Sequence, residues 1–311
     1  MAEPDHSPAL PASSPPQAAA LELGRAPGHL VRCAQQTHSA LWHAEFGTEL
    51  TSPQYAVLSI LSDHPNSDQR TAGSLASLDK SNIADVVRRL ELRGWLTRER
   101  DALDGRRNLL RLTGAAETAL STLSPRVAKV QDQLLGLLTD IDQDQFLTLL
   151  ARVAYRSSEA VPRPDRTTPT PAVEVSTAPG HLLRRAEQVH YALWFEEFGS
   201  GVTSPQYALI SALLHAATPL DQRTAGEIAS LDKSSLADVV RRLESRGWLT
   251  RVRDRGDGRR RILRLSPVAL YAIPQVTEGV LRVQERLVAP LTAGEPATLV
   301  RGLAAIAGSG R

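Results

Sequence analysis

The sequence predicts a mainly helical protein with small β-hairpins, built from two copies of one domain. Residues 79–113 recur as residues 232–266, with 26 of 35 positions identical. Apolar residues recur at helical spacing through much of both halves. Each copy also contains two short β-like runs around an Asp-Gly turn, which is typical of a hairpin. Because the repeat spacing of about 150 residues is far longer than a solenoid repeat, each copy is a whole domain.

Four segments are expected along the 311-residue chain. Residues 1–26 are rich in Pro, Ala and Ser, a composition that predicts a disordered tail. The two domains are expected at 27–158 and 179–311, because each begins at a shared Pro-Gly-His-Leu. Residues 159–178 between them are rich in Pro and Thr, which predicts a stiff, extended linker.

The first two helices follow from periodicity and capping. Apolar and aromatic residues recur through 28–46, which predicts a first helix. Ser52 is expected to be the N-cap of a second helix, with Pro53 in its first turn, that runs to about residue 62.

Two shorter helices are expected next. Thr71 is expected to cap a third helix that ends near Leu78. Asp79 is expected to cap a fourth over about 80–93, whose apolar side chains face inward and which Gly94 ends.

A hairpin and two long helices complete the copy. Residues 96–100 and 108–112 are predicted strands around a turn at Asp104. Residues 114–138 and 142–156 are predicted helices with more apolar surface than one small domain needs. We therefore expect this surface to pack against the other copy.

The second copy repeats these signals. Its second, third and fourth helices and its turn are expected to begin at Ser204 with Pro205, Thr224, Asp232 and Asp257 with Gly258. Its C-terminal helices differ most between the copies, and they are expected to be interrupted or bounded by Pro274, Pro290 and Pro296.

The fourth helix of each copy follows a short helix and a tight turn, the order of parts in a helix-turn-helix. In such a unit the second helix enters the DNA major groove, and cationic hairpin tips suit the minor groove. The net charge is only +2, but residues 241–264 hold ten Arg against three acids, a local basic stripe. The candidate DNA-binding residues are Ser81, Asn82, Asp85, Arg88, Arg89, Asp104, Arg106 and Arg107, and Ser234, Ser235, Asp238, Arg241, Arg242, Asp257, Arg259 and Arg260.

Two acidic residues in this set need a separate explanation, because DNA is a polyanion. Asp85 could accept a hydrogen bond from a cytosine amino group, or it could orient Arg88 or Arg89, and the second role is favoured. Asp104 is expected both to shape the turn and to pair with Arg106.

These parts resemble the winged helix of MarR-type transcription regulators, the multiple-antibiotic-resistance regulator family. The resemblance is carried by 79–113, by the preceding Leu-Thr-Ser-Pro-Gln-Tyr, and by an Asp-x-Arg wing signature at Asp104 and Asp257. It covers about 28–156 and 180–307. It implies a DNA-binding regulator, by family habit a repressor, whose family members are homodimers with interleaved first and last helices that read a pseudo-palindrome.

This chain departs from the family pattern by carrying both protomers in tandem. We therefore expect an intramolecular pseudo-two-fold dimer with interleaved N- and C-terminal helices that works as a single chain. A short tether gives an effective concentration on the order of mM, so pairing does not depend on protein level. The expected partner is double-stranded DNA with an inverted repeat whose half-sites lie ~34 Å apart.

The first helices suggest an effector site. Three residue types recur in both: Arg32, His38 and Trp42, and Arg184, His190 and Trp194. An Arg, a His and an aromatic wall on nearly one face suit a small aromatic carboxylate or phenol. Some MarR-type regulators of aromatic catabolism resemble this pattern. The alternative is an interface ion pair made by the Arg, with a core His and Trp.

Two further histidines and the single cysteine leave other interpretations open. His29 and His181 are expected to precede the first helix of each copy and to be caps or pocket edges. Cys33 could sense peroxide if its thiol were accessible and acidic, although Arg185 holds the matching position. A winged-helix protein-interaction module is the third interpretation.

Several classes of protein are disfavoured by the sequence. No phosphate-binding Gly loop, metal-ligand spacing or nucleophile–base set appears, so no enzyme, metal or cofactor is expected. One cysteine excludes an intrachain disulfide, and no secretory signal or membrane-length apolar run appears. A reducing, cytoplasmic setting is expected.

Overall fold

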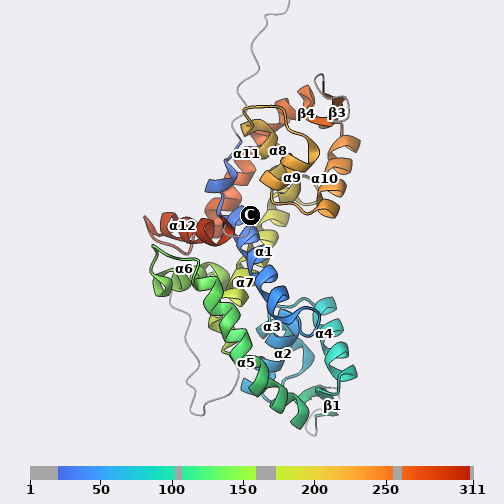
Figure 1. The fold of residues 1–311 in the computed structure, drawn as a ribbon, viewed down its shortest axis with the longest axis vertical. Coiled ribbons are helices and arrows are strands. Elements are labelled where there is room, and N and C mark those ends of the chain that lie inside the picture. Colours follow the sequence, from blue (N-terminus) through green and yellow to red (C-terminus); the bar gives the residue numbers. More distant parts are fainter. Residues whose placement is uncertain (1–19, 102–106, 159–172, 255–260, 309–311) are drawn as a thin grey trace, which may run out of the picture. The chain divides into compact units, whose positions relative to one another are not determined.

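The computed structural model describes residues 20–101, 107–158, 173–254 and 261–308 (Figure 1). The chain divides into two compact units, a larger one of residues 24–199 and 282–311 and a smaller one of residues 1–23 and 200–281. Each unit contains one helix-turn-helix and one two-stranded hairpin.

The larger unit contains the first winged helix together with helices from both copies of the repeat. Its elements are α1 (Pro27–Phe46), α2 (Ser52–Asp63), α3 (Gln69–Leu75), α4 (Lys80–Leu92), β1 (Leu96–Arg100), β2 (Asn108–Leu112), α5 (Gly114–Leu135), α6 (Gln143–Tyr155), η2 (Val175–Thr177), α7 (Pro179–Phe198) and α12 (Glu295–Gly308). The short η1 (Leu23–Arg25) precedes α1.

The smaller unit contains the second winged helix. Its elements are α8 (Ser204–His215), α9 (Gln222–Ile228), α10 (Lys233–Ser245), β3 (Leu249–Arg253), β4 (Arg261–Leu265) and most of α11 (Pro267–Val288). The order and lengths repeat those of α2 to β2, as the duplicated sequence predicts.

Both hairpins are antiparallel and have the same register. Leu96 pairs with Leu112 in the first, and Leu249 with Leu265 in the second. An isolated bridge from Asp68 to Leu109 ties the loop before α3 to the first hairpin, and the second unit has the equivalent bridge. The hairpin is therefore attached to the helix-turn-helix at both ends.

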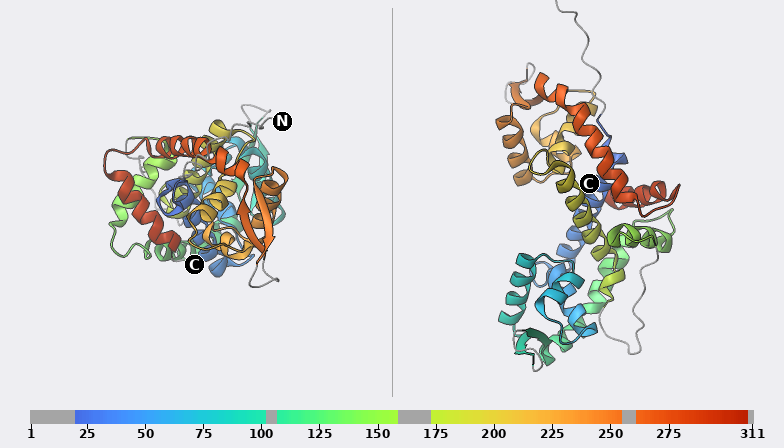
Figure 2. Two further views of the ribbon diagram at one scale, coloured as in Figure 1. Left: turned by 90° about the horizontal axis from the view of Figure 1, so that it is seen from above. Right: turned by 180° about the vertical axis from the view of Figure 1, so that it is seen from behind.

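The first and last helices of the two copies interleave, as expected. Within the larger unit, α1 packs along α12 and α7 packs along α6, which is the same contact made twice with the copies exchanged. Helices α6 and α12 also lie against each other (Figure 2). The apolar surface predicted on the C-terminal helices is thus buried against the other copy.

The N-terminal boundary of each copy was predicted too late in the chain. In the larger unit, the Tyr55 hydroxyl accepts from the amide of Val173, and Ser59 Oγ donates to the Val173 carbonyl, at 2.8 Å each. In the smaller unit, Leu21 meets Tyr207 and Ser211 in the same way. Residues 20–26 of the expected disordered tail and 173–178 of the expected extended linker therefore have defined structure. Leu21 and Val173 each dock, within their unit, on the second helix of the opposite copy.

Two helix caps also differ from the prediction. Thr51, not Ser52, caps α2, and its side chain and that of Gln54 form a reciprocal capping box. Asp68, not Thr71, caps α3, because its carboxylate accepts the amide of Thr71 at 2.8 Å. The second copy is shifted in the same way, with caps at Thr203 and Asp221 instead of Ser204 and Thr224.

The prolines of the second copy have different effects. Pro290 lies between α11 and α12, and Pro296 lies in the first turn of α12, as expected of residues that bound helices. Pro274 was expected to do the same, but α11 continues through it, as α5 continues through Pro125. A proline removes one backbone hydrogen bond, and the remaining bonds of a 22-residue helix maintain it here.

Candidate DNA interface and effector cavity

The predicted recognition helix α4 presents the expected polar face. Ile83 and Val87 are buried, whereas Ser81, Asn82 and Arg88 are exposed. The exposed face of α4 therefore carries the side chains that are predicted from the sequence to bind DNA.

The first turn of α4 is fixed by its cap. Asp79 accepts hydrogen bonds from the backbone amides of Ser81 and Asn82 at 2.9 and 2.8 Å, and from both of their side chains. The hydrogen bond from the Asn82 amide is the largest cause that holds the pKa of Asp79 below its usual range. Asp232 binds Ser234 and Ser235 in the same way in α10.

Asp85 lies between two arginines of the same face. Its carboxylate accepts from Arg88 at 2.6 Å and from Arg89 at 2.7 Å. The hydrogen bond from Arg88 is the first cause that lowers the pKa of Asp85. Asp238 makes the same pair of contacts with Arg241 and Arg242. This geometry agrees with the favoured interpretation, in which the aspartate orients the arginines.

The hairpin tips lie mostly outside the described residues. This applies to Asp104 with Arg106 and to Asp257 with Arg259 and Arg260, so their predicted roles stay predictions. Arg107 is described, and it forms ion pairs with Asp68 at 2.9 Å and Asp101 at 3.9 Å. It is therefore bound to the loop that caps α3.

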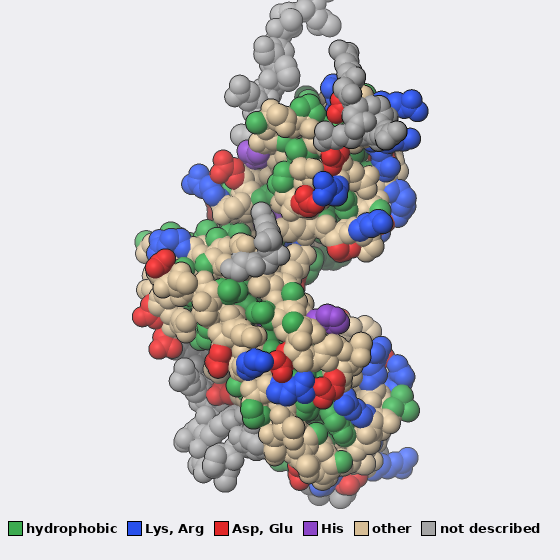
Figure 3. Space-filling model, viewed as in Figure 1, with side chains coloured by type: hydrophobic (Ala, Val, Ile, Leu, Met, Phe, Trp, Pro, Cys, Tyr) green, Lys and Arg blue, Asp and Glu red, His purple; other side chains and the backbone are tan. Residues whose placement is uncertain are grey.

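Arginine side chains gather over the exposed faces of the two recognition helices. In Figure 3 the Lys and Arg side chains collect over α4 and over α10, and acidic side chains are interspersed among them. A cationic helix face of this kind is the electrostatic basis of DNA binding.

A cavity in the larger unit contains two of the predicted effector residues and a third from the other copy. His38 and Trp42 of α1 line it together with Arg184 of α7. The sequence had placed Arg32, His38 and Trp42 in one site on one helix. That grouping was wrong: since α1 and α7 pack against each other, His38 and Trp42 line the cavity with Arg184 of the opposite helix and not with Arg32.

The same exchange occurs around the second set. Arg32 is close enough to His190 to lower the pKa of its imidazole, after the larger effect of burial. Trp194 packs edge-on against His190, with ring centroids 5.5 Å apart. In both groups, the arginine of one copy therefore lies near the histidine of the other copy.

The cavity is small in this arrangement, with room for about one water molecule, and it is partly open to solvent. Its apolar walls include Trp42, Tyr55, Val127 and Val175, and no carboxylate of the described residues lines it. Sequence reasoning missed the contributions of α2, α5 and η2, and His181 joins the lining as the expected pocket edge. The match of Ala-Leu-Glu-Leu at 20–23 with Ala-Val-Glu-Val at 172–175 was the available signal for η2.

Arg184 is held by neutral acceptors. Its Nη2 donates to the carbonyl of Ala76 at 2.8 Å and to Nδ1 of His181 at 3.0 Å, and Nη1 lies 3.5 Å from Ser52 Oγ. Burial lowers the pKa of Arg184 to about 10. Within the described part of the chain, both ring nitrogens of His38 and the Nε of Arg184 are buried without a hydrogen-bond partner.

The cavity arginine is also connected to the turn of the first helix-turn-helix. Ala76 is the C-cap of α3, and Ser77 follows it in the turn that leads to α4. Arg185 donates to Ser77 Oγ at 2.7 Å, and Gln188 donates to the Ser77 carbonyl at 2.6 Å. Three hydrogen bonds from α7 therefore hold the turn that leads into α4.

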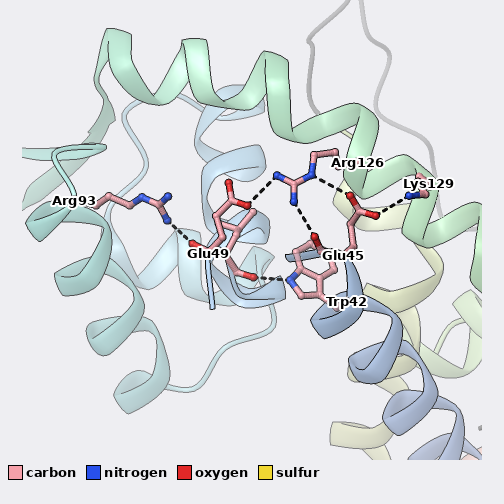
Figure 4. A network of polar contacts seen from close by, with 7 residues as sticks. Trp42, Glu45, Glu49, Arg93, Arg126 and Lys129 are labelled. Atoms are coloured by element: carbon pink, nitrogen blue, oxygen red, sulfur yellow. Dashed lines mark hydrogen bonds and ion pairs between the residues drawn. The ribbon is translucent and has the colours of Figure 1, made fainter. Parts of the chain in front are cut away.

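A second network joins the cavity wall to the end of α4 (Figure 4). Arg126 of α5 donates to Glu45 and Glu49 at 3.0 and 2.9 Å, and Arg93 donates to the Glu49 carbonyl. Trp42 donates its indole N–H to the Leu50 carbonyl at 2.7 Å. The segment after α1 thus contacts both the cavity tryptophan and the residue that ends the recognition helix.

Three histidines at the packing of α1 and α7 are kept neutral by their surroundings. Burial, with a smaller contribution from the nearby Arg184 or Arg32, lowers the pKa of His38 and of His190 to about 4 and that of His181 to about 3. The unfolded chain, with values near 6.5, binds more protons below that pH. Stability is therefore complete above pH 6.5 and is lost as the pH falls toward the folded values.

We expect His38→Gln to reduce the loss of stability on acidification. Between pH 7 and pH 5 the free energy of unfolding of the wild type should fall by about 2 kcal/mol more than that of the variant. Urea unfolding at both pH values measures this difference. His43→Gln, at an exposed position of the same helix, is the control, and an equal fall in wild type and His38→Gln would contradict the expectation. Glu187 titrates with the opposite sign, but equally in both proteins.

Cys33 is 3 % exposed, and its Sγ lies 3.4 Å from Nε2 of His29. Arg32 donates to Nδ1 of the same imidazole at 3.1 Å. The thiol is thus buried in the packing of α1 and lacks the access that a peroxide sensor needs. His29 lies within the first turn of α1 and not before it, as the helix begins at Pro27.

Two exposed recognition helices, each followed by a hairpin, define a winged helix-turn-helix protein that binds DNA. The sequence model of the MarR family matches residues 50–107 and again residues 200–260. The transcriptional regulator HosA of Escherichia coli is 34% identical over 125 residues, which are 40% of this chain and 92% of HosA. The chain therefore belongs to the MarR family of transcription regulators, and it contains two MarR domains.

Two other similar proteins come from different bacteria. The transcriptional repressor NicR of Pseudomonas putida is 27% identical over 144 residues, which are 46% of this chain and 91% of NicR. The crystal structure of the PcaV transcriptional regulator of Streptomyces coelicolor with its natural ligand is 47% identical. It covers 40% of this chain and 89% of PcaV, with a TM-score of 0.38. In the described part of this chain, no helix is both long enough and apolar enough to cross a membrane.

Proposed function

We propose that this chain is a repressor that binds an inverted-repeat operator and is released by a small aromatic carboxylate or phenolic acid bound at Arg184. The observation that carries the proposal is the guanidinium of Arg184. It lines a cavity with an aromatic wall and at the same time donates to the carbonyl of Ala76 in the helix-turn-helix. NicR, which is similar over one domain, is named a repressor.

Each part of an aromatic acid has a matching group in the cavity. Arg184 can donate two parallel hydrogen bonds to the carboxylate. Its present acceptors, the Ser52 hydroxyl and the His181 imidazole, are neutral and form weaker hydrogen bonds than a carboxylate would. Trp42 and Tyr55 offer flat apolar walls for one ring. His38, neutral and without a partner among the described residues, can bond a ring hydroxyl as donor or acceptor. Because the cavity is small in this arrangement, its side chains must move apart to admit a ring, which favours one ring over two.

Binding would act on DNA through the contacts of α7. A carboxylate on Arg184 competes with the Ala76 carbonyl for the same Nη2 group. Because Arg185 and Gln188 hold the adjacent Ser77, a shift of α7 also pulls on the turn before α4. A ligand can shift the recognition helix only if it binds the shifted arrangement more tightly than the DNA-binding arrangement. The hydrogen bonds of Arg184 to the carboxylate would supply this difference in affinity.

The operator side of the proposal rests on α4 and α10. Their exposed faces carry two short polar residues, one aspartate and two arginines at matching positions. Nearly identical recognition helices predict nearly identical half-sites, with slight asymmetry at Asn82 and its counterpart Ser235. Phosphate contacts by the arginines predict an affinity that falls steeply with salt.

The test uses the whole chain and the DNA upstream of its own gene. Fluorescence anisotropy should show binding that weakens as salt rises, and footprinting should show two inverted half-sites. Addition of 4-hydroxybenzoate should release the DNA, whereas the uncharged 4-hydroxybenzamide should not, because only the acid gives Arg184 an anion. Direct repeats, or equal release by the acid and the amide, would contradict the proposal.

A further inference from the structure

The faces that meet the two effector arginines differ between the copies. On α7 the face toward Arg32 consists of Glu187, His190, Tyr191 and Trp194, spaced at helical intervals. The matching face of α1 consists of Gln35, His38, Ser39 and Trp42. The histidine and tryptophan are retained, whereas the acid and the phenol occur in only one copy.

The described residues around Arg184 include no negatively charged partner. Its hydrogen-bond partners are a carbonyl, an imidazole and a hydroxyl, and within the described residues no carboxylate pairs with it. Gln35, which takes the place of Glu187, is half-buried, and its amide oxygen has no hydrogen-bond partner among the described residues. A half-buried cation without a counter-ion among the described residues favours an anionic ligand.

The surroundings of Arg32 contain the carboxylate of Glu187. Glu187 is half-buried on α7, which packs against the helix that carries Arg32, and it lies within electrostatic reach of the Arg32 guanidinium. Burial raises the pKa of Glu187 to about 7, and the attraction of Arg32 opposes that rise. Tyr191, one turn further, also lies within the electrostatic reach of Arg32 and Glu187. Above neutral pH the charge of Arg32 is therefore offset from within the protein.

We propose that each chain binds one aromatic acid, at Arg184, and that Glu187 excludes anions from Arg32. This inference rests on the proposed function, since it assigns the effector to one of the two sets. It also assigns the direct effect of the ligand to α4, because Arg184 and Arg185 hold the turn before that helix. Cys33 occupies the position of Arg185 in the other copy and offers no guanidinium.

Isothermal titration calorimetry with 4-hydroxybenzoate at pH 8 tests the stoichiometry of the full chain. We expect one site per chain in the wild type and in Arg32→Met, and a loss of affinity of about 100-fold in Arg184→Met. Glu187→Gln should create a second site. Gln35→Glu should weaken the site at Arg184 by about 10-fold or more, because it introduces the charge that Arg32 already faces.

Matched variants remove or add the same charge elsewhere on the same helices. Glu196→Gln on α7 and Gln36→Glu on α1 should keep one site of unchanged affinity, and thermal unfolding shows whether each variant folds. Two equal sites in the wild type, or one site in Glu187→Gln, would overturn this inference and leave the proposed function standing. No binding by any variant would overturn both.

Discussion

Replacement of Arg88 and Arg241 by alanine is expected to weaken operator binding by about 100-fold or more. Each side chain is 60–71% exposed on its recognition helix and is held by an aspartate of the same face. An arginine that contacts a base edge contributes about 1–3 kcal/mol to DNA binding, and the double replacement removes one from each recognition helix. Fluorescence anisotropy at several salt concentrations measures both the affinity and its salt dependence.

The control for this variant removes one arginine away from the recognition helices. Arg301→Ala, at an exposed position of α12, should leave the affinity within about two-fold, because phosphate and base contacts are then unchanged. If Arg88 and Arg241 bind only phosphates, affinity should fall equally for operator and random DNA, with a smaller salt slope. Unchanged operator affinity would remove both residues from the interface.

Phe146→Ala is expected to cost about 3–5 kcal/mol of stability, the largest effect of a single core replacement. Phe146 of α6 is fully buried, and its ring occupies the space that a side chain at Gly302 of α12 would need. In the other copy Leu299 takes the place of Phe146, and Leu149 takes the place of Gly302. A large and a small residue therefore correspond to two residues of intermediate size. Alanine would leave a cavity that backbone packing on both sides cannot close.

Urea unfolding, monitored by circular dichroism, measures this change as a lower midpoint with an unchanged slope. Phe195→Ala is the matched control, because Phe195 is 70% exposed on α7, and its replacement should change stability by no more than about 0.5 kcal/mol. A loss below about 1 kcal/mol for Phe146→Ala would mean that α6 and α12 repack without it.

Local signals were sufficient where one helix supplies all the partners of a residue. Asp79 was predicted as a cap because its carboxylate reaches amides only two and three residues away. The pairing of Asp85 with Arg88 and Arg89 follows from helical spacing for the same reason. Where two capping residues stand three apart, as Asp68 and Thr71 do, composition alone did not distinguish the cap from the residue whose amide it binds.

The effector set shows what spacing along one helix cannot predict. Arg32 and His38 were grouped because both lie on nearly one face of α1. The structure pairs His38 with Arg184, since a face buried in a helix–helix contact meets side chains of the partner helix before its own. The docking of Val173 on Tyr55 is equally remote, at 118 residues of separation.

The duplicated segments, the order of helices and hairpins and the arginine-bearing recognition faces were all readable from the sequence, because each depends on periodicity or on neighbours within one turn. Only the tertiary structure decided that Arg184 of one copy completes the cavity lined by His38 and Trp42 of the other. That choice depends on how α1, α6, α7 and α12 interleave. The contrast between Gln35 and Glu187 was visible in the sequence, but it acquired a meaning only when α7 was found to lie against Arg32.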